Sequence, residues 1–97
     1  MGKKEYRYPH RANVKTVAAR LRRDLEKQAQ EYGMTLTRES DTRYRLKRTG
    51  AELTLKVERD ALVVTVDLGW FAEGFRGRIE SGLNEGIPKM LKECERA

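Results

Sequence analysis

The sequence contains few of the residues from which catalytic and metal sites are usually built. It has one cysteine, Cys94, and one histidine, His10. A single cysteine excludes an intramolecular disulfide. A structural zinc site needs four ligands. One cysteine and one histidine cannot supply them, and no carboxylate cluster has a suitable spacing. We therefore expect neither a metal nor a cofactor in this chain.

Apolar residues are also limited, at 38% of the 97 residues against 37% charged. No apolar run approaches the ~20 residues of a membrane-spanning helix, and the basic N-terminus lacks the apolar stretch of a secretory signal. A cytoplasmic protein is therefore expected. A chain of this length buries only ~60–65% of its unfolded surface, so its core is thin, and a homodimer is one way to extend it.

The two reactive side chains have no neighbours in the sequence that would make them catalytic. His10 lies in a basic segment without an evident nucleophile or base, so a capping or surface role is expected. Cys94 lies between Glu93 and Glu95, whose charges would raise a thiol pKa and disfavour the thiolate. The other carboxylates lack the spacing of a paired acid and base, and no phosphate-binding glycine loop is present. We therefore predict that the protein is not an enzyme.

Positive charge is concentrated in the first half of the chain. The net charge of +6 is the sum of +8 in residues 1–48 and −2 in residues 49–97. This distribution can attract nucleic acid, an acidic protein or an anionic surface. The simpler interpretation is a solvated surface that keeps the protein soluble.

Residues 1–12 are predicted to form a basic N-terminal arm, and residues 13–97 a single domain. Pro9 interrupts regular structure in the arm, although the alternation of Tyr6 and Tyr8 with charged residues also fits a short edge strand. A helix is predicted over residues 14–32, where apolar residues recur at three- and four-residue steps. Asn13 is a suitable N-cap, and Gly33 stands where a left-handed residue ends many helices.

Four runs of alternating apolar and polar residues follow this helix. They cover residues 34–37, 43–47, 52–58 and 62–68. A period of two is the signal of a half-buried strand, and the breaks between the runs are short enough for hairpins. These runs predict an antiparallel meander with one apolar and one polar face.

A second helix is predicted from the region of residues 70–73 onward. Five of the eight glycines lie in residues 69–86, and each costs a helix interior ~1 kcal/mol relative to alanine. Gly82 and Gly86 project onto the apolar stripe, which predicts close backbone packing on the sheet or the first helix. Pro88 predicts a bend or a restart. The predicted fold is therefore α+β, in the order α-β-β-β-β-α, with both helices on one face of a four-stranded antiparallel meander.

Two groups of residues are candidates for binding a partner. Trp70, Phe71 and Phe75 would form an apolar surface at the start of the second helix; in the alternative, Phe71 and Phe75 enter the core and Trp70 covers the sheet edge. The polar strand face would present an anion or nucleic-acid surface made of Arg43, Arg45, Lys47 and Lys56. That face lacks the aromatic platforms on which single-stranded nucleic acids stack, because the alternation directs Tyr44 inward.

The order of these features resembles the polyhydroxyalkanoic acid system family, small bacterial proteins associated with polyhydroxyalkanoate granules. The likeness covers roughly residues 10–92, and its most specific part is residues 68–80, which read LGWFAEGFRGRIE. The resemblance implies an accessory role at granules and brings no catalytic residues with it. The sequence departs from the family pattern in its Lys-rich arm and where Gly82, Gly86 and Pro88 interrupt the last helix.

Three functions follow as hypotheses. The first is a non-enzymatic accessory protein that binds the granule surface or granule proteins through an apolar helix edge, with a homodimer as one form. The second is a small nucleic-acid-binding module that uses the arm and the basic strand face. The third is an enzyme or small-ligand carrier with a pocket between the helices and the sheet, for which no residue gives specific support.

Overall fold

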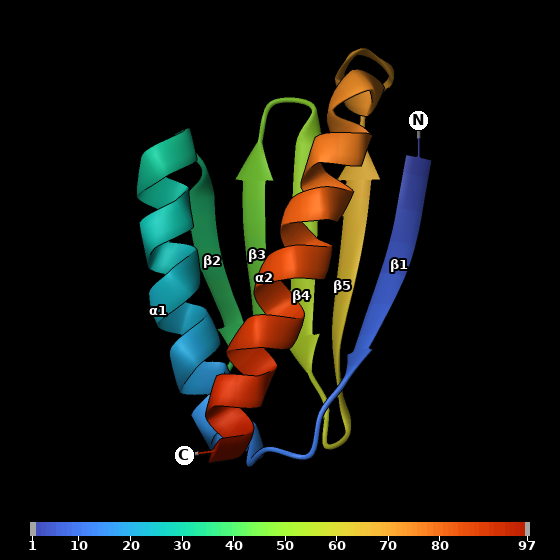
Figure 1. The fold of residues 1–97 in the computed structure, drawn as a ribbon. Coiled ribbons are helices and arrows are strands. Elements are labelled where there is room, and N and C mark those ends of the chain that lie inside the picture. Colours follow the sequence, from blue (N-terminus) through green and yellow to red (C-terminus); the bar gives the residue numbers. More distant parts are fainter. Residues whose placement is uncertain (1, 97) are drawn as a thin grey trace.

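The computed structural model describes residues 2–96 (Figure 1). Its elements are β1 (Gly2–Pro9), α1 (Val14–Tyr32), β2 (Thr35–Ser40), β3 (Arg43–Arg48), β4 (Ala51–Val57), β5 (Ala61–Leu68), the 3₁₀-helix η1 (Trp70–Phe75) and α2 (Arg76–Arg96). The predicted α+β class is confirmed, as are the helix, the four strands and the helix that follow one another in residues 14–96.

The strands form one antiparallel sheet in the order β1-β5-β4-β3-β2. Strands β2 to β5 make the predicted meander. The sheet has five strands instead of four because the segment predicted as an arm contains β1, which pairs with β5 from Gly2 opposite Leu68 to Pro9 opposite Ala61. The edge strand suggested by the alternation of Tyr6 and Tyr8 is therefore the structure that this segment adopts. Pro9 is tolerated because it ends an edge strand.

Helix α1 begins and ends where the sequence predicts. The side chain of Asn13 accepts hydrogen bonds from the backbone N–H groups of Lys15, at 2.8 Å, and Thr16, at 3.4 Å. Gly33 ends the helix with φ of 62°, a left-handed backbone conformation that residues other than glycine rarely adopt. Local capping therefore defines both ends of this helix.

Both helices cover the same face of the sheet, as predicted (Figure 1). The core lies between the two layers, and each layer contributes buried side chains. The largest fully buried ones are Leu62, Leu68, Val17, Val64 and Val66. Tyr44 is buried as the alternation predicted, so the apolar face of the sheet is read correctly from the sequence.

Helix α2 differs from its prediction in two respects. It does not restart at Pro88 but runs from Arg76 to Arg96, and Ile87 and Met90 on either side of the proline are buried in the core. The predicted close packing of Gly82 and Gly86 is wrong, since a Cβ added at either would meet nothing within 4 Å.

Close packing was wrongly predicted for Gly82 and Gly86 because the apolar stripe of the helix was placed on the wrong side. The prediction included Phe71 and Phe75 in the stripe, which moved its calculated centre around the helix toward the glycines. The residues of α2 that are buried lie farther along the chain, at Ile87, Met90, Leu91 and Cys94. With that centre, the glycines fall on the solvent side of the helix.

Candidate functional site

The helix layer has two ends that differ in how well they are covered. At one end the start of α1 lies against the end of α2, where Arg20 Nη2 is 2.8 Å from Glu93 Oε1 and the backbone N–H of Arg11 donates to Glu95 at 3.0 Å. Toward the other end the helices diverge (Figure 1). We call the first the Cys94 end. We call the second the η1 end and define it by the Thr49–Gly50 turn and η1.

Exposure of the apolar side chains of α2 rises from the Cys94 end to the η1 end. Ile87 and Leu91 are buried, whereas Ile79 and Leu83 are only half-buried. In η1 itself, only Ala72 is buried. Apolar side chains at the η1 end are therefore largely uncovered.

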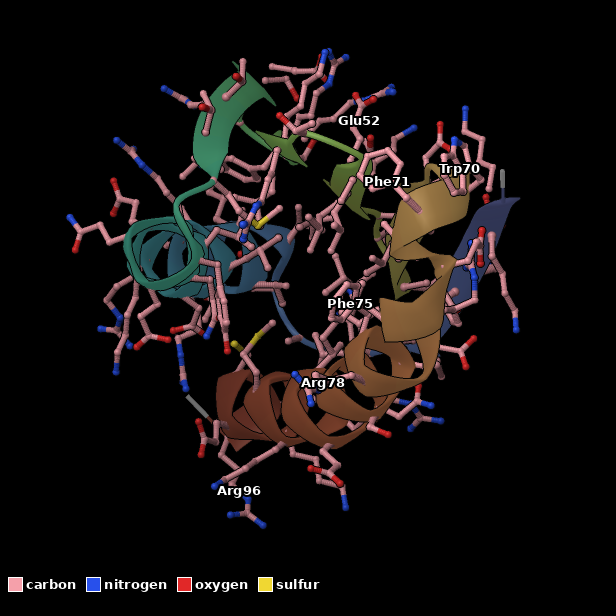
Figure 2. All side chains as sticks on the ribbon, turned by 90° about the horizontal axis from the view of Figure 1, so that it is seen from above. Glu52, Trp70, Phe71, Phe75, Arg78 and Arg96 are labelled. Carbon is pink, nitrogen blue, oxygen red and sulfur yellow. The ribbon has the colours of Figure 1, made fainter. Side chains whose placement is uncertain are left out.

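Three aromatic side chains make up this surface. Trp70 is 81% exposed, Phe71 55% and Phe75 57%, so the interpretation in which Phe71 and Phe75 enter the core is wrong. The rings of Trp70 and Phe71 meet edge to face, with their centroids 5.7 Å apart. We call Trp70, Phe71 and Phe75 the aromatic cluster. Viewed from the η1 end, Figure 2 shows Phe71 and Phe75 on the side turned toward α1, and Trp70 farther from α1.

The turn between β3 and β4 supports Phe71, one ring of this cluster. The backbone N–H of Gly69 donates to the carbonyl oxygen of Gly50 at 2.8 Å. The ring of Phe71 lies so close to Gly50 that a Cβ there would be 2.4 Å from it, and Gly50 has φ of +82°. Glycine at this position therefore satisfies both the left-handed turn and the contact with the aromatic ring.

A polar seam joins α2 to the edge strand β1. Arg76, Glu80 and Asn84 are four residues apart and so share one face of the helix. Arg76 donates to the carbonyl oxygen of Gly2 at 2.7 Å, and Tyr8 donates to Asn84 at 2.7 Å. Glu80 accepts hydrogen bonds from Lys4, at 3.0 Å, and from Tyr6. The spacing of the helix residues was visible in the sequence, but its meaning required knowledge that residues 2–9 form a strand.

These contacts alter the acidity of the carboxylate at the centre of the seam. The hydrogen bond from Tyr6, together with that from Lys4, holds the pKa of Glu80 below its usual value. Burial, followed by the hydrogen bond to Glu80, raises the pKa of the Tyr6 phenol. The seam is thus an arrangement of phenol, ammonium and carboxylate that stabilises the ionised form of Glu80.

His10 is buried, at 4% exposure, so the predicted surface role is wrong and the predicted capping role describes its contacts. Its Nε2 lies 2.9 Å from the carbonyl oxygen of Glu58, and its Nδ1 accepts from the backbone N–H of Ala12 at 3.2 Å. These partners require the neutral ring to carry its proton on Nε2. Both ring nitrogens are thus used to hold the segment between β1 and α1 against the end of β4.

Cys94 is buried in the core, with its Sγ 3.8 Å from the Sδ of Met90. Burial, more than the neighbouring carboxylates, raises the pKa of its thiol, which disfavours the reactive thiolate. Among residues 2–96, no group of His, Cys, Asp and Glu side chains is arranged to hold a metal ion.

The predicted basic surface lies on the uncovered face of the sheet but is largely neutralised there. Arg43 pairs with Glu39 at 3.0 Å, and Arg45 pairs with Glu52 at 3.0 Å and also with Glu39. Lys56 lies 4.0 Å from Glu58. Within the part of the chain that the structure describes, Lys47 alone of the four predicted cations has no carboxylate at ion-pair distance.

A shallow depression on this face contains both signs of charge. It has a volume of about 140 Å³ and is lined by Lys3, Arg43, Arg45, Glu52, Thr54, Thr65 and Asp67. A nucleic-acid strand laid across it would meet carboxylates as well as cations. The face therefore attracts polyanions less than its count of Lys and Arg suggests.

Comparison with known proteins identifies the family to which this chain belongs. No curated protein and no solved structure matched this chain. The helices described here are not long and apolar enough to cross a membrane. Residues 6–91 match the family described as polyhydroxyalkanoic acid system proteins. Because that match covers most of the 97 residues, from the middle of β1 to near the end of α2, the chain belongs to the polyhydroxyalkanoic acid system protein family.

Proposed function

We propose that this protein is a non-enzymatic accessory protein of the polyhydroxyalkanoate system and binds the granule surface through the aromatic cluster. The observation that carries the proposal is the exposure of Trp70, Phe71 and Phe75, each more than half exposed. Several large apolar side chains exposed at one end of a small domain mark a site of interaction. Family membership supplies the choice of partner, and a cytoplasmic location is part of the proposal.

The chemistry of the polymer fits this cluster. A polyester surface offers apolar methylene and methyl groups together with ester carbonyl oxygens, which accept hydrogen bonds and donate none. The indole N–H of Trp70 is a donor, and an amphipathic ring of this type prefers boundaries between apolar material and water. The phenyl rings of Phe71 and Phe75 would lose exposed surface on the same contact, which favours binding by about 25 cal/mol per Å².

The absence of enzymatic activity is also a proposal. Its support is that His10 uses both ring nitrogens on backbone groups and that Cys94 is buried beside Met90. Neither side chain has the exposed nucleophile or base beside it that acid–base or covalent catalysis requires.

The test is sedimentation of the full chain with protein-free particles of poly(3-hydroxybutyrate). Trp70 is the only tryptophan, so a shift of its fluorescence emission to shorter wavelength on binding reports directly on the cluster. Trp70→Ala should lower the affinity by about tenfold or more, because burial of a large side chain contributes ~1.5–3 kcal/mol.

The matched control is Tyr32→Ala. Tyr32 is 57% exposed, as is Phe75, but it ends α1 and lies outside the cluster, so its loss should leave binding unchanged. Absence of the chain from the pellet, or equal losses for Trp70→Ala and Tyr32→Ala, would refute the role of the cluster.

A further inference from the structure

The η1 end also carries positive charge that the rest of the chain does not neutralise. A depression of about 420 Å³ at this end is lined by Thr35, Thr37, Arg45, Lys47, Arg48, Thr49 and Gly50. Three of these residues are cations, three have hydroxyl groups, and none is a carboxylate. The depression therefore differs from the smaller one on the same sheet, where both signs of charge meet.

Two of the three cations are available for a ligand. Arg45 is held by Glu39 and Glu52. In residues 2–96, by contrast, no carboxylate lies at ion-pair distance from Lys47 or Arg48. Arg48 donates one N–H to the carbonyl oxygen of Tyr32 at 3.0 Å, which positions the guanidinium and leaves its other donors for a second acceptor.

The cationic depression, which lies mainly on the uncovered face of the sheet, and the aromatic cluster, on the helix side, meet at Gly50. Gly50 lines the depression and is also the residue on which the ring of Phe71 packs. Arg78, which is exposed, lies beside Phe75 on the side of α2 turned toward α1 (Figure 2). Two carboxylates at this end are paired, Glu52 with Arg45 at 3.0 Å and Glu73 with Arg76 at 2.8 Å. Exposed aromatic rings and uncompensated cations thus occupy one end of the molecule.

We infer that the η1 end docks on an anionic lipid surface. The aromatic cluster enters the boundary between headgroups and acyl chains, where tryptophan is enriched, and Lys47 and Arg48 bind headgroup phosphates. Charge complementarity selects this partner, because a basic group near an anionic surface and exposed aromatics together give stronger attachment than either does alone. The inference rests on the same aromatic cluster as the proposed function, but its ligand is phosphate-bearing lipid and not polyester.

The experiment uses the full chain with two kinds of vesicle, phosphatidylcholine alone and phosphatidylcholine with about one third phosphatidylglycerol. Sedimentation and the emission wavelength of Trp70 give the two readouts. We expect binding to the anionic vesicles that weakens as salt is added, because the charges are then screened, and much weaker binding to the neutral ones.

The decisive variant is Lys47→Gln with Arg48→Gln. Each charge removed near an anionic surface should lower the affinity about fivefold, so the double variant should lose roughly 25-fold. The matched control is Lys89→Gln with Lys92→Gln, which removes the same net charge from exposed positions of α2 beyond the middle of the helix and should change the affinity less than twofold. Thermal unfolding of both variants checks that the fold is kept.

Several outcomes would overturn the inference. One is the absence of binding to anionic vesicles. Another is an equal loss in the two double variants, which would make the attraction a matter of net charge alone. A third is an equal change of Trp70 emission with inorganic phosphate alone, which would make the depression an anion site that needs no lipid. Failure with vesicles but binding to polyester particles would leave the proposed function standing, and the reverse pattern would leave only this inference.

Discussion

Apolar side chains are buried at the Cys94 end of the helix layer and exposed at the η1 end. At the Cys94 end, Leu91 and Met90 belong to the core and are almost completely buried. At the η1 end, Phe75, which the sequence pattern placed in the same apolar stripe, is 57% exposed. The two helices diverge toward this end, so α1 does not cover its side chains as it does at the Cys94 end (Figure 1). One end therefore stabilises the fold, and the other is available for a partner.

The largest expected effect comes from truncation of the core at the Cys94 end. Leu91→Ala should lower the free energy of unfolding by ~2–5 kcal/mol, because it removes a buried side chain and leaves a cavity. Phe75→Ala, at the η1 end, should change it by less than ~1 kcal/mol. Chemical denaturation measures both values. Similar losses for the two variants would contradict the division into a core end and a surface end.

The next effect concerns the turn that supports the aromatic cluster. Gly50→Ala should destabilise the protein by ~2–3 kcal/mol, since it combines a left-handed backbone with a Cβ placed 2.4 Å from the ring of Phe71. Gly33→Ala is the control, because its φ is +62° but nothing lies within 4 Å. It should lose only the ~1 kcal/mol of backbone strain.

Adding Phe71→Ala to Gly50→Ala tests the contact directly. If the ring causes the additional loss, the double variant should recover part of it, with a coupling energy of ~0.5–2 kcal/mol. Additive losses in a double-mutant cycle would show that Phe71 does not pack on the turn.

A smaller effect, an increase in stability instead of a loss, is expected from substitutions on the solvent side of α2. Gly82→Ala and Gly86→Ala should each raise the melting temperature, because alanine favours a helix by up to ~1 kcal/mol and a Cβ meets nothing within 4 Å at either position. Destabilisation by either change would mean that this side of the helix packs closely on another surface, such as a second copy of the chain.

The smallest effect concerns the seam between β1 and α2 and appears in acid. The pKa of Glu80 is lowered in the folded protein, so its contribution to stability is complete above the ordinary glutamate pKa of about 4.3. It is lost as the pH falls through the lower folded value. Tyr6→Phe removes the first cause of that shift and should flatten the loss of stability below about pH 4. An unchanged pH profile for the variant would show that Tyr6 does not act on Glu80.

The sequence predicted the parts of the fold that depend on local signals. Both ends of α1 were predicted correctly from Asn13 and Gly33, because capping involves only neighbouring backbone groups. The alternating runs predicted β2 to β5 and the inward position of Tyr44, because one face of the sheet is uniformly apolar. These features need no knowledge of how distant segments meet.

The parts that could not be predicted depend on long-range contacts. Strand β1 carries Lys4 on its helix side, where Glu80 neutralises it, so its pattern is not apolar and resembles an arm. The exposure of Phe71 and Phe75 depends on the divergence of the helices, which no local pattern records. The pairing of Arg43 and Arg45 with Glu39 crosses the β2–β3 hairpin, and it turned a predicted basic surface into a mixed one.

The place of β1 at the edge of the sheet has a consequence for synthesis on the ribosome. The first strand of the chain pairs with β5, residues 61–68, and its inner side is held by Arg76, Glu80 and Asn84. Because β5 and these helix residues follow β1 in the sequence, the edge strand can make its native contacts only after they have been translated. Its lysines and arginine keep this extended stretch hydrated until those partners are available.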